Sequence, residues 1–253
     1  MMTHSRYGVN LDTAGFLLWA VVQWDMTPEF SPVGDRAARI VFGVEISPPI
    51  NAHIRRFCHS LEVKPIWGVT EWVPGYAAVI VYYRPWDIAY DALCGELARR
   101  GQRRANAPRP EARRVEIPVC YGGDYGPDLG EVAAAHGLTP AQVIERHSGV
   151  DYLVYFLGFL PGFPYLGGLD PSLATPRRAT PRRSVPAGSV GIAGAQTGVY
   201  PLETPGGWQI IGRTPICLYD PHRQPPTLLA AGAYVRFISI TARQFEEIVN
   251  DSR

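Results

Sequence analysis

The chain has 253 residues, and its 24 Lys and Arg residues against 23 Asp and Glu residues give a formal net charge of +1. A near-neutral chain lacks the basic excess typical of proteins that bind nucleic acids or anionic membranes. With 46% hydrophobic residues, it can bury a substantial core in one large domain or two ordinary ones. We therefore expect a globular protein with no nucleic-acid or membrane partner.

The four cysteines lie far apart and show no Cys-x-x-Cys spacing, so neither a zinc site nor a disulfide framework is indicated. Reduced thiols favour a cytoplasmic protein, and we expect no metal. The apolar run at 15–24 is too short for a membrane span and lacks the features of a secretion signal. We interpret residues 1–30 as an N-terminal extension, either an extra strand or a poorly ordered segment.

Residues 31–105 are expected to form a small α+β domain. Its predicted elements are a strand at 36–42, a helix opened by Ser47-Pro48-Pro49, strands at 66–73 and 76–83, and a helix at 87–100. With a strand starting near Arg114, the order is β-α-β-β-α-β, which suggests a ferredoxin-like domain. That last strand could instead begin the next domain.

A polar, proline-containing stretch follows, and we place a linker at 106–113. Two short helices come next; the first ends at Gly137 and the second opens with Thr139-Pro-Ala-Gln142, which has the form of a capping box. Such a pair could be mistaken for a DNA-binding helix-turn-helix. The second helix offers only Arg146 as a strong contact to phosphate or guanine, so we exclude that function.

Residues 114–250 are expected to form a β-barrel domain, because short apolar runs alternate with Gly/Pro turns beyond Val150. The predicted strands are 152–160, 189–193, 208–211, 216–219 and 234–240, followed by a helix at 242–250.

Catalytic signatures are scarce. The sequence contains no Gly-x-Ser-x-Gly elbow, no Walker-type phosphate loop and no His-Glu-x-x-His. His147 and His222 could carry protons, although a hydrogen-bonded structural histidine is the more common outcome. No pair of nucleophile and base can be assembled from spacing, so the catalytic residues stay unidentified.

The arginines of the barrel domain are its concentrated positive charges. Proline stiffens the chain before Arg177 and Arg182, and guanidinium groups held in this way can bind a carboxylate or phosphate through paired hydrogen bonds. The alternative is that they pair with acids such as Asp170 and Glu203. Arg213, between Gly212 and Thr214-Pro215, is the strongest single candidate.

Further candidates lie in the glycine-rich segment 188–198 and in loops rich in aromatic residues. Gln196, Thr197 and Tyr200 could orient the amide or carboxylate of a ligand, or satisfy backbone groups at a bend. The aromatic residues flanked by glycine and proline are candidates for lining a groove or an interface. These are Phe159, Phe163, Tyr165 and Trp208.

Four long motifs occur in order along the chain: Cys120-Tyr-Gly-Gly-Asp-Tyr-Gly-Pro-Asp-Leu, Gly158-Phe-Leu-Pro-Gly-Phe-Pro-Tyr-Leu, Pro186-Ala-Gly-Ser-Val and Pro205-Gly-Gly-Trp. On these motifs the chain resembles the carboxyltransferase subdomain C/D family, which includes the B subunit of 5-oxoprolinase, the kinase inhibitor KipI and allophanate hydrolase subunit 1. The resemblance runs from about Val33 to Phe237. One departure is Gly232-Ala233, where the family usually has Gly-Asp.

The resemblance implies a small α+β domain followed by a cyclophilin-like β-barrel. It also implies the B subunit of an ATP-dependent 5-oxoprolinase complex, which cleaves 5-oxo-L-proline to L-glutamate, with ATP bound by or shared with a partner. The implied partners are the homologous cyclophilin-like C subunit of 5-oxoprolinase and its LamB/YcsF-type A subunit. The alternatives are a KipI-like inhibitor of a sensor histidine kinase, or the carboxyltransferase half of a urea carboxylase or allophanate hydrolase system.

Overall fold

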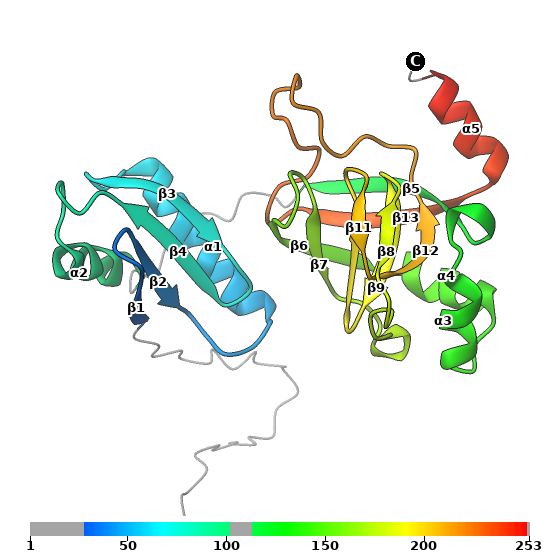
Figure 1. Cartoon of the computed structure of the whole chain (residues 1–253), viewed down its shortest axis with the longest axis horizontal. Coiled ribbons are helices and arrows are strands. Elements are labelled where there is room, and N and C mark those ends of the chain that lie inside the picture. The colour runs from blue at the N-terminus through cyan, green and yellow to red at the C-terminus, as the bar shows by residue number, and fades with distance from the viewer. Residues whose placement is uncertain (1–27, 102–112, 252–253) are drawn as a thin grey trace, which may run out of the picture.

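The computed structural model describes residues 28–101 and 113–251, which form two units (Figure 1). Most of the predicted N-terminal extension, 1–30, and all but the last residue of the predicted linker, 106–113, lie outside the described residues. The protein is a mixed α+β structure, as expected, with a small domain followed by a closed β-barrel.

The small domain has a four-stranded antiparallel sheet in the order β1-β2-β4-β3. Its elements are β1 (Glu29–Val33), β2 (Ala37–Val41), α1 (Pro48–Val63), β3 (Val69–Pro74), β4 (Ala78–Tyr83) and α2 (Tyr90–Gly101). Helix α1 begins as predicted, because the Ser47 side chain caps it by accepting a hydrogen bond from the Ile50 amide. Ile54 and Leu61 share one face of this helix and are fully buried in the domain core.

The predicted order β-α-β-β-α-β is wrong for this domain, and a ferredoxin-like fold is not confirmed. The strand expected to complete the sheet, β5 (Arg114–Tyr121), pairs instead with strands of the barrel, where Ile117 and Val119 are fully buried. The edge beside β2 is occupied by β1, a strand that the sequence pattern did not indicate. Strand β1 contains Pro32, which cannot donate to a ladder and is tolerated because β1 is an edge strand.

Seven strands close the barrel in the order β10-β7-β6-β13-β5-β12-β9. Beyond β5 they are β6 (Asp151–Leu157), β7 (Pro164–Gly167), β9 (Ser189–Ala193), β10 (Gln196–Val199), β12 (Gln209–Arg213) and β13 (Tyr234–Ile240). A separate ribbon pairs β8 (Arg182–Val185) with β11 (Thr204–Gly206). The first strand and the last strand of the barrel, β5 and β13, lie side by side and parallel, which joins the two ends of this domain.

The predicted strand at 216–219 is wrong. This apolar run lies in a loop in which only Tyr219 forms an isolated bridge, with Thr227, and Leu218 is buried without belonging to a ladder. Strands β7, β8, β10 and β11 were missed because each is three or four residues long and most contain glycine or proline. Short segments of this kind form strands only because neighbouring strands supply their hydrogen bonds.

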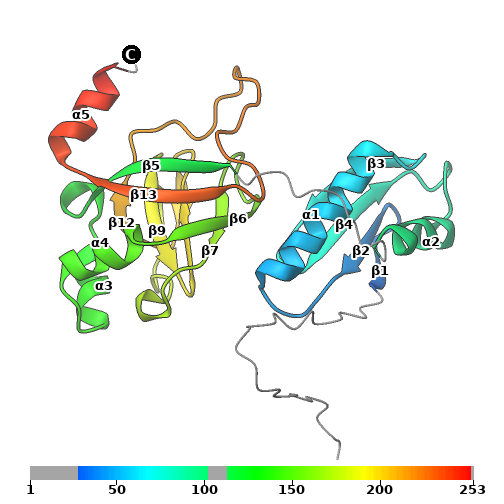
Figure 2. The same ribbon diagram turned by 180° about the vertical axis from the view of Figure 1, so that it is seen from behind.

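Helices α3 (Leu129–Ala135) and α4 (Pro140–Ser148) lie against strands β12 and β13 of the barrel (Figure 2). The predicted capping box is present in full at Thr139 and Gln142. A last helix, α5 (Ala242–Asp251), packs Phe245 against Tyr125, with 4.5 Å between ring centroids.

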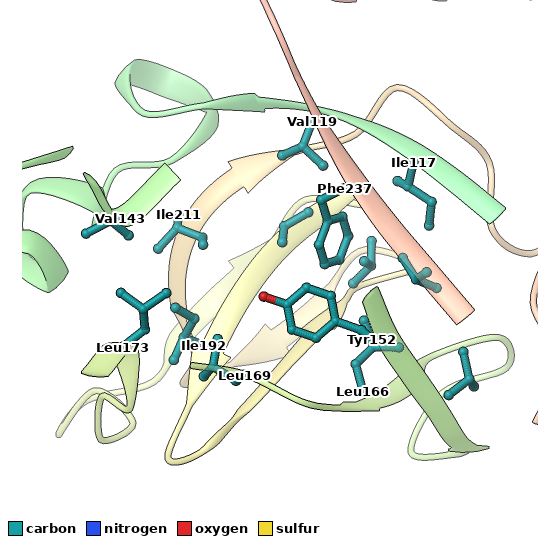
Figure 3. Close-up of a cluster of buried hydrophobic side chains, with 14 of the residues drawn as sticks. Ile117, Val119, Val143, Tyr152, Leu166, Leu169, Leu173, Ile192, Ile211 and Phe237 are labelled. Atoms are coloured by element: carbon teal, nitrogen blue, oxygen red, sulfur yellow. The ribbon is translucent and has the colours of Figure 1, made fainter. Parts of the chain in front are cut away.

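Side chains fill the interior of the barrel (Figure 3). Tyr152 and Phe237 meet at its centre with 5.4 Å between their ring centroids, and smaller aliphatic residues from other strands surround them. Interiors of this kind are close-packed and contribute stability through buried apolar area. A ligand site is therefore expected on the outside of the barrel.

The two domains contact each other through helix α1 and the turn between β3 and β4. The Asn51 side-chain amide donates a hydrogen bond to the Tyr155 carbonyl at 2.9 Å. Tyr76, in the turn, packs on aromatic residues of the barrel. Gly232, which lies before β13, has a φ of 86°, which favours glycine, and its Cα faces the Arg55 side chain of α1.

Candidate functional site: an arginine and aromatic face of the barrel

A buried carboxylate organises the arginine-rich loop. Asp128 is 2% exposed, and its Oδ1 accepts hydrogen bonds from Arg178 Nη1 at 2.8 Å and from Arg182 Nη2 at 2.6 Å. Its Oδ2 accepts the backbone amide of Ile210 at 2.6 Å. One buried negative charge thus holds two guanidinium groups and one barrel strand together, and exposed Glu131 lies 3.6 Å from Arg178, so the excess positive charge of this region comes from the nearby Arg177.

The loop carrying these arginines is also tied to the barrel through its backbone. The Arg178 amide donates to the Gly207 carbonyl at 2.7 Å, and Gln209 Nε2 donates to the Pro176 carbonyl at 3.1 Å. The positions of the guanidinium groups are therefore set by strand pairing as well as by Asp128.

Several donors of this loop are not used within the described residues. Arg178 Nε and Arg182 Nη1 are buried and have no hydrogen-bond partner there, and exposed Arg177 forms no ion pair there. Buried donors are normally satisfied by protein groups, water or an ion. Donors without a protein partner beside an excess positive charge make this face of the barrel a candidate site for an anion.

Beside the arginines, aromatic rings pack edge to face. Phe163 lies 5.4 Å from Tyr200, 5.5 Å from Trp208 and 5.2 Å from Tyr165, measured between ring centroids. The structure places Phe163, Tyr200 and Trp208 in the core, at 1%, 1% and 6% exposure. Phe159 is 65% exposed and Tyr165 is partly buried, so these two offer the accessible ring surface among the four aromatic candidates.

Glycines in this region leave room for the rings. A Cβ at Gly198 would lie 3.0 Å from Phe163 and 3.2 Å from Trp208, and one at Gly206 would lie 2.5 Å from the Tyr200 hydroxyl. Glycine is needed at both positions because the aromatic rings approach the backbone directly.

The charge of Arg177 acts on two of these aromatic residues. Burial raises the pKa of the Tyr165 hydroxyl, and the nearby positive charge of Arg177 opposes that rise. Burial likewise raises the pKa of Tyr200, against the opposing effects of a hydrogen bond with the Trp208 backbone and the charge of Arg177. Arg177 therefore stands close to the aromatic cluster, which brings a cation and apolar rings together on one face.

The three remaining polar candidates of the sequence form hydrogen bonds with other protein groups. Gln196 Nε2 donates a hydrogen bond to the Tyr76 hydroxyl of the small domain. Thr197 is fully buried and donates to the Gly191 carbonyl at 3.0 Å. Arg213 Nε donates to the Ala187 carbonyl at 2.8 Å, beside the turn at Gly188, so this guanidinium supports the glycine-rich segment.

His147 belongs to a buried network. Since Thr197 Oγ1 donates its hydrogen to Gly191, it accepts from His147 Nε2 at 2.9 Å, and His147 Nδ1 then accepts from the Tyr121 hydroxyl at 2.8 Å. Burial lowers the pKa of His147 to about 3. The imidazole is neutral at physiological pH and joins α4 to the barrel. His222, in contrast, lies exposed in the loop before β13.

Two residues of this region were missed by sequence reasoning, Asp128 and Tyr76. The Gly-Pro-Asp motif at 126–128 gave a signal for Asp128, but nothing in the sequence shows that two arginines fifty residues away converge on it. Within the described residues, no group of His, Cys, Asp and Glu is arranged to hold a metal ion. The helices described there are all too short or too polar to cross a membrane.

Related sequences carry functional names. The chain is 42% identical over 234 residues to the B subunit of the 5-oxoprolinase of Bacillus subtilis, covering 88% of this chain and 98% of that protein. It is 52% identical over 200 residues to the B subunit of the 5-oxoprolinase of Escherichia coli O157:H7, covering 77% and 90%.

Two solved structures of related proteins resemble this chain in fold and in sequence. The structure of TTHA0988 superposes with a TM-score of 0.72 at 39% identity over 82% of this chain, which spans only 40% of that protein's length. PH0987 from Pyrococcus horikoshii gives a TM-score of 0.52 at 44% identity over 86% of this chain and all of that one.

The urea amidolyase of K. lactis gives a TM-score of 0.74 over 88% of this chain and 15% of that one, at 22% identity, which shows a shared fold alone. The family model of the carboxyltransferase domain, subdomain C and D, matches residues 28–229. The chain therefore belongs to the carboxyltransferase subdomain C and D family.

Proposed function

We propose that this chain is the B subunit of an ATP-dependent 5-oxoprolinase, which together with partner subunits cleaves 5-oxo-L-proline to L-glutamate. The observation that carries this proposal is the 42% identity to the B subunit from Bacillus subtilis over nearly the full length of both chains. The chain acts as part of a complex on this proposal, because the relatives that support it are themselves named as subunits.

The substrate is a small carboxylate with a cyclic amide, and its ring opening develops negative charge on the amide oxygen. The arginine and aromatic face supplies a matching environment, since guanidinium groups stabilise carboxylates and developing oxyanions. Arg177 and Arg183 are both exposed and form no ion pair within the described residues, and of these two it is the charge of Arg177 that acts on the Tyr165 and Tyr200 hydroxyls. We assign it to the substrate carboxylate.

The nucleotide is held elsewhere in the complex on this proposal. Arg178 and Arg182 are both engaged with Asp128, and Arg177 by itself does not provide the cradle of amides and cations that a triphosphate requires. ATP would therefore be bound by a partner or shared with one. The partners proposed are the C subunit, a homologous protein with a cyclophilin-like barrel, and the LamB/YcsF-type A subunit.

We also propose a cytoplasmic location. The four cysteines are free in the structure, which favours a reducing compartment such as the cytoplasm.

Phe159 is the residue that we propose for contact with a partner. It is an exposed aromatic residue with a positive φ of 68°, and local strain of this kind is typical of functional positions. We assign it to the interface with one of the partners.

The test is to co-express the chain with its two partner subunits and to follow glutamate and ADP formation from 5-oxoproline. Glutamate formation that depends on this chain supports the proposal, and a rate equal to that of the partners alone contradicts it. Urea in place of 5-oxoproline tests the carboxyltransferase alternative, and inhibition of a sensor histidine kinase tests the KipI-like alternative.

Arg177→Ala should raise the KM for 5-oxoproline by roughly tenfold or more, since a charged hydrogen bond contributes about 1.5–3 kcal/mol. Arg183→Ala is the matched control, because Arg183 is an exposed arginine of the neighbouring strand β8.

A further inference from the structure

The turn between β3 and β4 places one side chain of the small domain on the barrel. Tyr76 follows Gly75 at the tip of this hairpin, which is closed by a hydrogen bond from the Gly75 amide to the Ala78 carbonyl at 2.8 Å. Its ring centroid lies 4.8 Å from Phe156, 5.6 Å from Tyr155 and 5.7 Å from Tyr165. The Tyr76 ring is thus held by three aromatic rings of the barrel.

The same side chain also receives a hydrogen bond. Gln196, the first residue of β10, donates its side-chain amide hydrogen to the Tyr76 hydroxyl oxygen. The environment of Tyr76 therefore combines ring faces and edges with one amide donor directed at an oxygen. These are the contacts that a planar amide or lactam needs, with its carbonyl oxygen in the place of the phenol oxygen.

One buried polar group at the contact between the domains has no hydrogen-bond partner among the described residues. Asn51 is fully buried, and its Nδ2 donates to the Tyr155 carbonyl, but its Oδ1 has no hydrogen-bond partner within the described residues. A buried acceptor left unpaired costs free energy that separation of the domains would recover. The hairpin itself contacts the barrel through Tyr76, which meets Gln196 and three aromatic rings.

Two related structures match this chain to different degrees. PH0987 has the higher identity to this chain, and its TM-score is lower than that of TTHA0988 over a similar share of the chain.

We propose that Tyr76 is an intramolecular plug, occupying the barrel subsite that a lactam takes when the hairpin withdraws. The subsite consists of the Gln196 amide and the rings of Tyr155, Phe156 and Tyr165. The identity of the lactam as 5-oxoproline rests on the proposed function, whereas the plug itself rests on the contacts of Tyr76. A ligand that binds only the withdrawn state has an apparent Kd equal to its intrinsic Kd divided by the fraction of molecules in which the subsite is open.

The experiment measures binding of 2-pyrrolidone and of 5-oxoproline to the full chain without partners, by ligand-observed NMR titration. Tyr76→Ala should bind both lactams about tenfold more tightly than the wild type, because it removes both ring packing and the competing hydroxyl. Tyr76→Phe, which keeps the ring and frees the Gln196 amide, should give a smaller gain. Tyr82→Ala is the matched control, since Tyr82 lies on the neighbouring strand β4 and is 39% exposed.

Two further measurements separate a plug from a merely structural contact. Adding Gln196→Ala to Tyr76→Ala should abolish the gain in affinity. Saturating the wild type with lactam should speed amide hydrogen exchange at 75–78, the hairpin tip, while exchange in α1 shows that the small domain stays folded.

Equal or weaker lactam binding by Tyr76→Ala overturns the proposal, and so does a gain that survives the loss of Gln196. These outcomes are independent of the proposed function. Tighter binding of 2-pyrrolidone together with a complex that makes no glutamate would support the plug and remove the oxoprolinase assignment.

Discussion

Replacing Asp128 with asparagine should strongly destabilise the barrel. The substitution keeps the shape of the side chain but removes the charge that Arg178 and Arg182 share, and leaves the two guanidinium groups facing each other. Removing one partner of a buried ion pair costs about 3–5 kcal/mol. Since the arginines are 32% and 25% exposed, solvent offsets part of this cost, and we expect a loss of about 3 kcal/mol.

Urea unfolding of the isolated chain measures this loss, and the fluorescence of Trp208, the one tryptophan beyond residue 86, reports on the barrel. In a thermal scan the same loss corresponds to a decrease in Tm of roughly 10 °C. Glu131→Gln is the control, because Glu131 lies 3.6 Å from the same Arg178 but is 72% exposed, and it should cost less than about 0.5 kcal/mol. A change for Asp128→Asn as small as that of the control would refute the reasoning.

Three further predictions concern the pH dependence, the glycines and Phe159. The pKa of His147 is lowered to about 3 in the folded protein, so only the unfolded chain binds the proton between pH 6.5 and 5; stability should fall by about 1.6 kcal/mol over this range in urea titrations, and His147→Gln should lack that component. Gly206→Ala should cost about 1–3 kcal/mol, because its Cβ meets Tyr200, whereas Gly207→Ala, whose nearest neighbour is 3.6 Å away, should be nearly neutral in the same thermal scan; similar values for the two would contradict the packing argument. Phe159→Gly should leave the stability of the isolated chain unchanged or raise it by up to about 1 kcal/mol, since it relieves a positive φ, while weakening partner binding at least tenfold in a pull-down titration; unchanged binding would remove Phe159 from the interface.

Local sequence was sufficient to predict elements that depend only on residues close together in the chain. Ser47 before two prolines indicates the start of α1, and Thr139 with Gln142 indicates the capping box of α4; both are confirmed because a cap depends on residues within one helical turn. The strand 189–193 was predicted with its observed bounds, since a strand buried on both faces reads as a continuous run of apolar and small residues.

Candidate site residues were harder to interpret, because their roles depend on partners distant in the chain. Arg182 was a candidate anion-binding group in the sequence, with pairing to an acid such as Asp170 or Glu203 as the alternative, and in the structure it pairs with Asp128, a residue 54 positions earlier. Gln196 reads as a ligand contact, and the structure shows it bonded to Tyr76 from the other domain, 120 positions away. Sequence spacing does not reveal contacts that arise only when strands and domains come together.

The sequence by itself determined the caps, the strongly periodic helices, the mixed α+β class and the family to which the chain belongs. Only the tertiary structure decided that β5 belongs to the barrel, that β1 completes the small sheet, and which arginines of the described loop pair with an acid. The physical reason is that hydrogen bonding between strands and the neutralisation of buried charge are settled by contacts between distant segments. The same reason makes Tyr76 visible only in the folded chain, where a turn of one domain meets the rings of the other.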